Sequence, residues 1–168
     1  MEIWDILDET GALTGRTVER GRKIAPGDYH LVVHIWIIDE SGNMLIQKRS
    51  PDLSWMPGIW AATGGAAIQG EDSITAALRE THEELGLCIA PEKFTLLTRQ
   101  RRADDFSDIW IARGQRSEFS DIVMCPEVAD TRWVTWGGLS AMIADGTFVR
   151  YDYFDILSHA VVSRGTAR

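Results

Sequence analysis

The sequence has few of the features that mark secreted, membrane-spanning or nucleic-acid-binding proteins. Its 168 residues include two cysteines, Cys88 and Cys125, too few and too far apart for a disulfide framework or a zinc site with paired ligands. The longest apolar-rich segment, residues 31–38, is much shorter than the ~20 residues that span a bilayer. Residues 1–9 lack a basic stretch followed by an apolar run, so we expect a cytoplasmic protein with no membrane partner.

Positive charge is also in deficit, with 17 Lys and Arg residues against 25 Asp and Glu residues, a net charge of −8. A protein that holds nucleic acid through a basic surface needs the opposite balance, so we do not expect a nucleic-acid scaffold. The place of the acidic residues is a separate question, because carboxylates packed on one face require a counter-ion.

No internal repeat, low-complexity tract or Pro/Ser-rich linker divides the chain. Apolar residues make up 45% of it and charged residues 25%, which is typical of a folded globular protein and not of a disordered one. At this length the composition predicts a single domain over residues 1–168.

In the first part of the chain, hydrophobic periodicity and turn residues predict strands. The turn region around Gly11 and Gly15 lets residues 2–7 fold back into a hairpin. Residues 29–39 and 44–49 are separated by a turn and are expected to pair as antiparallel strands.

In the rest of the chain, the pattern predicts a central helix flanked by strands. From residue 72 to residue 85 the apolar period changes from 2 to about 3.6, which is typical of a helix. Further strands are predicted at residues 94–99, 108–112 and 131–135, and C-terminal helices at residues 139–144 and 151–163. This order predicts an α/β fold in which helices pack on a mixed sheet.

The central helix separates apolar from acidic side chains. Placed at about 100° per residue, the core-facing stripe consists of Ile74, Ala77, Leu78, Thr81 and Leu85. Glu80, Glu83 and Glu84 share a separate arc, where like charges repel by a few tenths of a kcal/mol per pair. Two interpretations are open: a solvated acidic face beside Arg79, or a site for a divalent cation such as Mg²⁺, which takes oxygen ligands.

The segment from Gly65 to Leu87 resembles the signature of the Nudix hydrolase family. The positions that match at fixed spacing are Gly65, Glu71, Arg79, Glu80, Glu83, Glu84 and Gly86. Thr81 departs from the pattern, since the family usually has an aliphatic residue there, although its methyl group can pack on the core stripe. The resemblance implies an α/β/α sandwich and a Mg²⁺- or Mn²⁺-dependent enzyme that hydrolyses a nucleoside diphosphate linked to another moiety.

The resemblance also implies roles for individual residues. Glu83 and Glu84 would be the principal metal ligands, and Glu80 a further ligand or the base that deprotonates the attacking water. The backbone carbonyl of Gly64 matches a position that supplies a metal ligand in some family members, with a plain turn glycine as the alternative. Arg79 would orient a glutamate through a bidentate pair.

Other residues would support the site. Gly65 and Gly86 would support the shape of the signature segment, and Glu71 would hold the loop to the helix start, with helix-dipole stabilisation as the alternative. Lys48 and Arg49 end a strand shortly before the segment and could contact a substrate phosphate, although such a pair is more often just solvated.

Two further kinds of residue stay open as candidates. Glu127 and Asp121 could supply the additional acid that lies outside the signature in many family members. Most of the 7 tryptophans should lie in the core, and one could stack on a base, but the sequence does not indicate which.

Two other functions remain as alternatives. Residues 29–49 and 57–60 also resemble the isopentenyl-diphosphate isomerase branch of the fold. That enzyme needs a cysteine where Gly64 stands and a histidine where Ala66 stands, so we expect no isomerase activity. The second alternative is a catalytically silent nucleotide-binding domain, although no glutamate of the signature is missing. We expect a small-molecule partner, a nucleoside di- or triphosphate ahead of a nucleotide sugar or dinucleotide, and a homodimer is possible because family members often form one.

Overall fold

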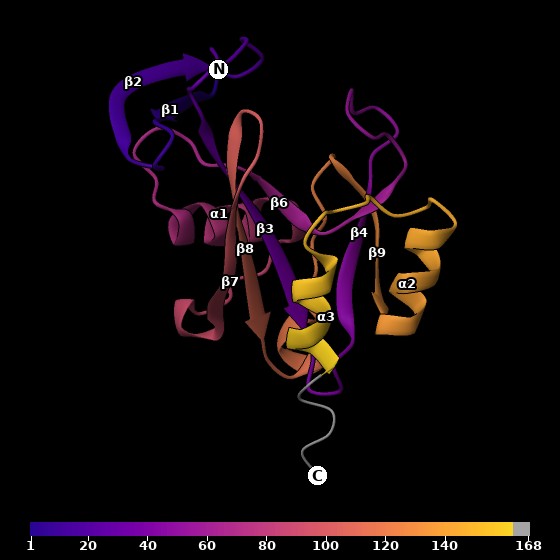
Figure 1. Ribbon diagram of the computed structural model, residues 1–168. Coiled ribbons are helices and arrows are strands. Elements are labelled where there is room, and N and C mark those ends of the chain that lie inside the picture. Colours follow the sequence, from indigo (N-terminus) through magenta and orange to yellow (C-terminus); the bar gives the residue numbers. More distant parts are fainter. Residues whose placement is uncertain (163–168) are drawn as a thin grey trace.

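The structure, a computed structural model, describes residues 1–162 and shows a mixed sheet with helices on both faces (Figure 1). Its elements in chain order are β1 (Ile3–Leu7), β2 (Leu13–Glu19), β3 (His30–Ile38), β4 (Met44–Arg49), β5 (Trp60–Ala61), β6 (Thr63–Ala66), α1 (Ser73–Leu85), η1 (Pro91–Lys93), β7 (Phe94–Arg101), β8 (Asp105–Arg113), η2 (Arg116–Phe119), β9 (Val128–Val134), α2 (Trp136–Ala144) and α3 (Phe154–Val162). The predicted α/β/α sandwich with a mixed sheet is confirmed.

The predicted elements are present, and the differences lie at their ends. The helix predicted from residue 151 begins at Phe154, because residues 151–153 form a turn that buries the rings of Tyr151 and Tyr153. The last residue of that prediction, Ser163, lies outside the described residues. Strand β6 was not predicted, because Thr63-Gly64-Gly65-Ala66 has little strand propensity and becomes a strand by pairing with β3.

Strand β3 forms the centre of the seven-stranded sheet. Along one edge it runs parallel to β8, and β7 pairs antiparallel with the far edge of β8. Along its other edge β3 pairs with β4 at Ile37 and Ile38, and with β6 from Val32 to Ile35. The antiparallel pairing predicted for β3 and β4 is therefore present, but it is short.

Beyond that short pairing, β3 and β4 diverge. Gln47 and Lys48 of β4 pair with β5, while β9 follows the other edge of β4 over its whole length. Residues 60–66, which form β5 and β6, thus fill the opening between β3 and β4. Contacts of α1 with β6 and β3 place this opening under the helix.

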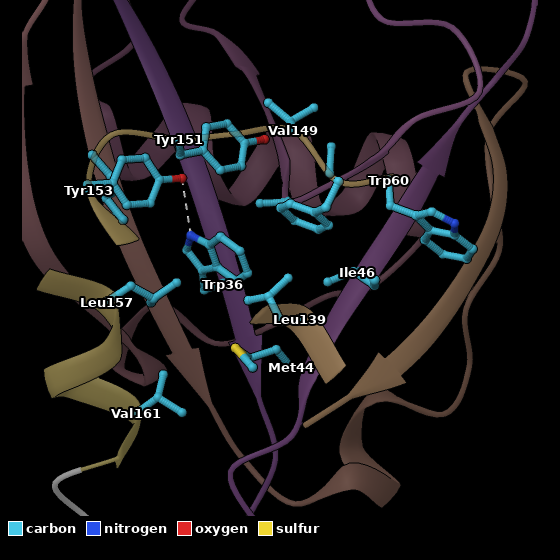
Figure 2. Packing of buried hydrophobic residues seen from close by; sticks show 14 of the residues in the cluster. Trp36, Met44, Ile46, Trp60, Leu139, Val149, Tyr151, Tyr153, Leu157 and Val161 are labelled. Atoms are coloured by element: carbon cyan, nitrogen blue, oxygen red, sulfur yellow. Dashed lines mark hydrogen bonds between the residues drawn. The ribbon is translucent and has the colours of Figure 1, made fainter. Parts of the chain in front are cut away.

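The two faces of the sheet are covered by different helices. Alternate residues of β3, Val33, Ile35 and Ile37, pack in one cluster with the buried side of α1. Trp36 and Ile38 point to the opposite face, where they pack against α2 and α3 (Figure 2). We call these the α1 face and the aromatic face.

The aromatic face is a dense group of rings. Its members are Trp36, Phe148, Tyr151, Tyr153 and Phe154, joined by ring contacts with centroid distances between 5.1 and 6.2 Å. The indole N–H of Trp36 donates to the hydroxyl of Tyr153 at 3.2 Å (Figure 2), and Nδ1 of His34 lies 2.9 Å from the same hydroxyl. The polar atoms buried here are therefore paired with one another.

The N-terminal hairpin, β1 and β2, forms a separate two-stranded sheet. The backbone carbonyl of Ile3 accepts a hydrogen bond from the N–H of Gln69, and Oδ2 of Asp5 accepts one from the N–H of Gly70 at 2.7 Å. The hairpin thus braces the loop that leads into α1. No helix within residues 1–162 is long and apolar enough to cross a membrane.

Candidate active site

Helix α1 is held at both ends and on its core side. Asp72 caps its start by accepting a hydrogen bond from the N–H of Thr75 at 2.9 Å, and Gly86 ends it in the left-handed conformation, with φ of 68°. Thr81 is buried as expected, and its hydroxyl donates to the carbonyl of Ala77 at 2.7 Å. The stripe that includes Thr81 and Leu85 fixes the rotation of the helix, and this rotation sets the directions of its glutamates.

Glu84 points down from α1 into the opening between β3 and β4. It is 7% exposed, and its Oε2 accepts hydrogen bonds from Nε2 of Gln47 at 2.8 Å and from the N–H of Gly64 at 3.0 Å. One carboxylate oxygen therefore joins α1 to β4 and to β6. Within residues 1–162 no hydrogen bond reaches Oε1 of Glu84, so this oxygen is available to another partner.

Arg79 organises the other carboxylates. Its Nε and Nη2 bind the two oxygens of Glu71 at 2.8 and 3.0 Å, and Nη1 donates to Glu80 at 2.9 Å and to Glu83 at 2.7 Å. Nη2 also donates to the carbonyl of Ala66. A planar guanidinium, whose several donors point in fixed directions, suits this role, whereas the single ammonium group of lysine does not.

Glu71 completes this arrangement. Its Oε2 accepts a hydrogen bond from the N–H of Ile68 at 3.0 Å, in addition to its bidentate pair with Arg79. The loop before α1 and the middle of the helix are therefore tied together through a single carboxylate. This geometry accords with the support role expected for Glu71.

Two adjacent glycines make room for the glutamates. A Cβ atom on Gly65 would lie 2.4 Å from Oε1 of Glu80, so the carboxylate occupies the space that any side chain here would need. A Cβ atom on Gly64 would lie 2.1 Å from the carbonyl oxygen of Val33, which no adjustment of a flexible side chain could relieve. Glycine is required at position 64 by the close approach of the β3 backbone, whereas a side chain at position 65 would displace the carboxylate of Glu80.

Burial shapes the electrostatics of the two inner glutamates. It raises the pKa of Glu84 to about 8, and the nearby charge of Glu80 adds to this rise, while the bonds from Gln47 and Gly64 and the charge of Arg49 oppose it. Burial also raises the pKa of Glu80 to about 7, against the attraction of Arg79. Both carboxyls would be stabilised in their charged form by an additional cation.

The donor set fits a hard divalent cation. Glu80, Glu83 and Glu84 offer carboxylate oxygens, the type of ligand that Mg²⁺ and Mn²⁺ take, and the backbone of Gly64 lies beside Glu84, to which its N–H donates. Within residues 1–162, no three His, Cys, Asp or Glu side chains already converge as a complete metal-binding group. Glu83 in particular is turned outward, with a side chain 56% exposed.

The candidates outside the signature segment lie at different distances from these carboxylates. Arg49 is near enough for its charge to act on Glu84, whereas Lys48 alternates to the other side of β4 and is opposite Trp60 and Asp130. Glu127 and Asp121 flank a segment whose Cys125 N–H donates to the carbonyl of Glu84. Among the described residues, neither of these acids contacts the three glutamates, and both stay predictions.

Sequence reasoning missed Gln47, which holds Glu84 in place. The sequence carried little signal for this role, because Gln47 stands between the apolar residues 44–46 and the basic pair Lys48-Arg49, and its burial, at 2% exposed, appears only in the structure. A buried polar side chain needs a hydrogen-bond partner. The identity of that partner could not be read from the sequence, since it depends on how β4 diverges from β3.

Most of this chain is similar in sequence to known proteins. The NUDIX domain family model matches residues 28–154. A protein named as an uncharacterized Nudix hydrolase from Listeria monocytogenes is 40% identical over 159 residues, which cover 94% of this chain and 94% of that one. An isopentenyl-diphosphate Delta-isomerase from Streptomyces avermitilis is 28% identical over 153 residues, which cover 87% of this chain and 77% of that one.

A solved structure gives a match over the whole fold. The crystal structure of DR0079 from Deinococcus radiodurans has a TM-score of 0.74 and 22% sequence identity, and the alignment covers 99% of this chain and 100% of that chain. At this identity the likeness concerns the fold alone.

Proposed function

This chain belongs to the Nudix family, and we propose that it is a Mg²⁺-dependent enzyme that hydrolyses a diphosphate bond in a nucleoside di- or triphosphate or a related nucleoside diphosphate derivative. The observation that carries the proposal is the carboxylate of Glu84, buried under α1 with one oxygen fixed by Gln47 and Gly64. Burying a carboxylate is costly, and a bound cation is the partner that offsets this cost.

The chain's own residues divide the work of such a reaction. Glu83, Glu84 and the carbonyl of Gly64 would hold the Mg²⁺, and Mn²⁺ could replace it. When bound, the cation would neutralise charge on the diphosphate and lower the pKa of the attacking water. Glu80, which Arg79 holds through a hydrogen bond of 2.9 Å, would accept a proton from that water.

Arg79 and Arg49 would act on different groups. Arg79 fixes the directions of Glu80 and Glu83, and is therefore a positioning residue. Arg49 lies near the buried end of the site and would contact a phosphate of the substrate, whereas Lys48 points to the other side of β4 and would reach a phosphate less readily. Glu127 or Asp121 would supply the further acid outside the signature segment.

Isomerase activity is disfavoured because the cysteine that this reaction requires would have to stand at the position of Gly64. A side chain at Gly64 would collide with the carbonyl of Val33, so a cysteine does not fit on this backbone, and Ala66 offers no metal ligand. His30 stacks on Trp4 with ring centroids 4.3 Å apart, as a packed residue does. A catalytically silent domain is disfavoured because the glutamates and Arg79 are all present and organised.

The test is phosphate release from a panel of nucleoside di- and triphosphates, nucleotide sugars and dinucleotides with Mg²⁺. The panel is run with wild type, with Glu83→Gln, and with Glu92→Gln as a matched control on the exposed helix η1. We expect turnover of at least one compound by wild type and by the control, with a large loss in Glu83→Gln. Failure of wild type to turn over any compound, or full activity of Glu83→Gln, would overturn the proposal, as would conversion of isopentenyl diphosphate into dimethylallyl diphosphate.

A further inference from the structure

The loop between β4 and β5 extends beyond the end of β4 (Figure 1). It is closed by backbone hydrogen bonds from Arg49 to Ile59 and from Gly58 to Arg49, and Trp55, in the middle of the loop, is 54% exposed. The next residue, Met56, has φ of 48°, a conformation that non-glycine residues rarely adopt. The loop therefore accepts backbone strain while it exposes a large apolar ring.

The other tryptophans are already engaged. Trp36 is fully buried, Trp60 is 8% exposed under the guanidinium of Arg132, and Trp110 donates to Ser73. The remaining three also contact other rings or a cation: Trp4 stacks on His30, Trp133 lies under Arg116, and Trp136 contacts Phe154. Among the tryptophans of residues 1–162, only Trp55 has more than half of its surface exposed to solvent.

Arg49 connects this ring to the carboxylates. Its Nε donates to the backbone carbonyl of Trp55 at 2.9 Å, and its guanidinium lies 4.8 Å from the centroid of the Trp55 ring. No described residue accepts a hydrogen bond from its two terminal nitrogens. Arg49 also follows Gln47, which binds Glu84, by two positions on β4, and its charge acts on both Glu84 and Tyr151.

The Trp55 ring, the Arg49 guanidinium and the buried carboxylates thus follow one another in space. At the inner end lie Glu80 and Glu84, next comes the guanidinium of Arg49 with two nitrogens available for bidentate contact with phosphate, and at the outer end lies the ring of Trp55. Arg49 lies over one face of that ring, and 54% of the Trp55 surface remains exposed for a further stacking partner. A nucleoside diphosphate has groups in the same order: a diphosphate, a sugar and a flat base.

We propose that Trp55 is the residue that recognises the nucleobase, by stacking its exposed ring on the base while Arg49 binds the adjoining phosphate. This inference rests on the proposed function and names the part of the chain that selects the leaving nucleoside. Stacking on an indole face is available to every base, so the site favours nucleotides over diphosphates that lack a ring and discriminates weakly among bases.

The proposal is tested by binding, which does not depend on turnover. Calorimetric titrations in the presence of Mg²⁺ use two probes: an adenosine diphosphate with a non-hydrolysable methylene bridge, and methylenediphosphonate, which has the same bridge but no base. The proteins are wild type, Trp55→Ala, Trp55→Phe and Arg49→Ala. Leu96→Ala, another exposed apolar side chain on β7, is the control, and circular dichroism confirms that each variant is folded.

We expect Trp55→Ala to weaken the nucleotide about 10-fold and to leave methylenediphosphonate unchanged. Trp55→Phe should retain most of the nucleotide affinity, and Arg49→Ala should weaken both probes. Unchanged nucleotide affinity in Trp55→Ala would overturn the inference, and so would equal weakening of both probes, because Trp55 would then act only by holding Arg49. A wild type that binds the nucleotide as expected but hydrolyses nothing would contradict the proposed function and leave the role of Trp55 standing.

Discussion

Both faces of the central sheet bury apolar side chains, but the α1 face also buries carboxyl groups of the signature segment. On the α1 face, Glu84 is almost fully buried and Glu80 largely so, and both have raised pKa values because burial disfavours their charges. On the aromatic face, Trp36 and Tyr153 are buried and their polar atoms hydrogen-bond to each other. Burial of the aromatic rings stabilises the fold, whereas burial of the Glu80 and Glu84 carboxyls on the α1 face costs free energy.

In such a fold, function is to be sought where a buried side chain costs stability. Apolar and aromatic burial needs no explanation beyond folding, whereas a carboxylate held under a helix by Gln47 and a glycine N–H does. Substitutions on the two faces should therefore affect activity and stability in opposite ways.

The largest contrast is expected from Glu84→Gln. The amide oxygen can still accept the bonds from Gln47 and Gly64, but the negative charge is lost. We expect kcat to fall about 10³-fold, since a bound metal ion supplies several kcal/mol to such a reaction. The free energy of unfolding of the metal-free protein should stay the same or rise, because a carboxyl that is costly to bury is replaced by a neutral amide. Chemical denaturation in the presence of a chelator measures the unfolding free energy, and steady-state kinetics measure kcat. If Glu84→Gln lost activity only because the protein unfolds, the proposed difference between the two faces would be wrong.

Leu157→Ala is the matching substitution on the aromatic face. Leu157 is fully buried on α3 (Figure 2), so its truncation leaves a cavity and should cost about 2–5 kcal/mol of unfolding free energy. The kcat of the folded fraction should not change. Denaturant titration gives the first quantity, and active-site-normalised kinetics give the second; a specific fall in kcat would show that the faces are not separate in function.

Arg79→Lys should lower activity by an intermediate amount. Lysine keeps the charge but cannot reproduce five hydrogen bonds from three nitrogens to Glu71, Glu80, Glu83 and Ala66. We expect activity to fall about 10- to 100-fold, with a higher Mg²⁺ concentration needed for half-maximal rate. Arg16→Lys is the control, because Arg16 makes an exposed bidentate pair with Asp28 far from this group. Equal effects of the two substitutions would show that Arg79 acts only as a surface ion pair.

The smallest effect is a difference in the pH dependence of stability. In the metal-free protein the pKa of Glu84 is raised from 4.5 to about 8, so the folded chain binds more protons and stability should fall as pH rises through this window. His34 acts in reverse: burial lowers its pKa from 6.5 to about 4, so stability should fall as pH drops from 6.5 to 4.

Two substitutions separate these contributions to the pH profile. Glu84→Gln should reduce the fall in stability as the pH rises from 4.5 to about 8, and His34→Asn should reduce the fall as the pH drops from 6.5 to about 4. Denaturant titrations across the pH range, with a chelator present, measure both slopes. An unchanged slope in either variant would show that the corresponding group does not titrate differently on folding.

Much of the fold could be predicted from the sequence because its signals are local. The period of residues 72–85, the cap at Asp72 and the stop at Gly86 determine α1 almost to the residue. The parallel pairing of β3 with β8 and the opening between β3 and β4 could not be predicted, since they depend on contacts between distant segments. Strand β6 exists only because that opening brings it beside β3.

The candidate site shows the same limit. Helical spacing places Glu80, Glu83 and Glu84 on one arc, and the structure separates them into two inner carboxylates and one outer one because the rotation of α1 is set by packing. The bonds of Arg79 to Glu80 and Glu83 accord with spacing along one helix. The bond of Gln47 to Glu84 and the contact of Arg49 with Trp55 required the tertiary structure.

The central claim is that the α1 face holds a divalent cation for a nucleotide substrate. The most direct measurement is a Mn²⁺ titration of wild type, Glu84→Gln and Glu92→Gln in the presence of the non-hydrolysable nucleotide. We predict saturable binding in wild type and in Glu92→Gln, and a dissociation constant at least about 10-fold higher in Glu84→Gln. Equal Mn²⁺ affinity in all three proteins would contradict the claim.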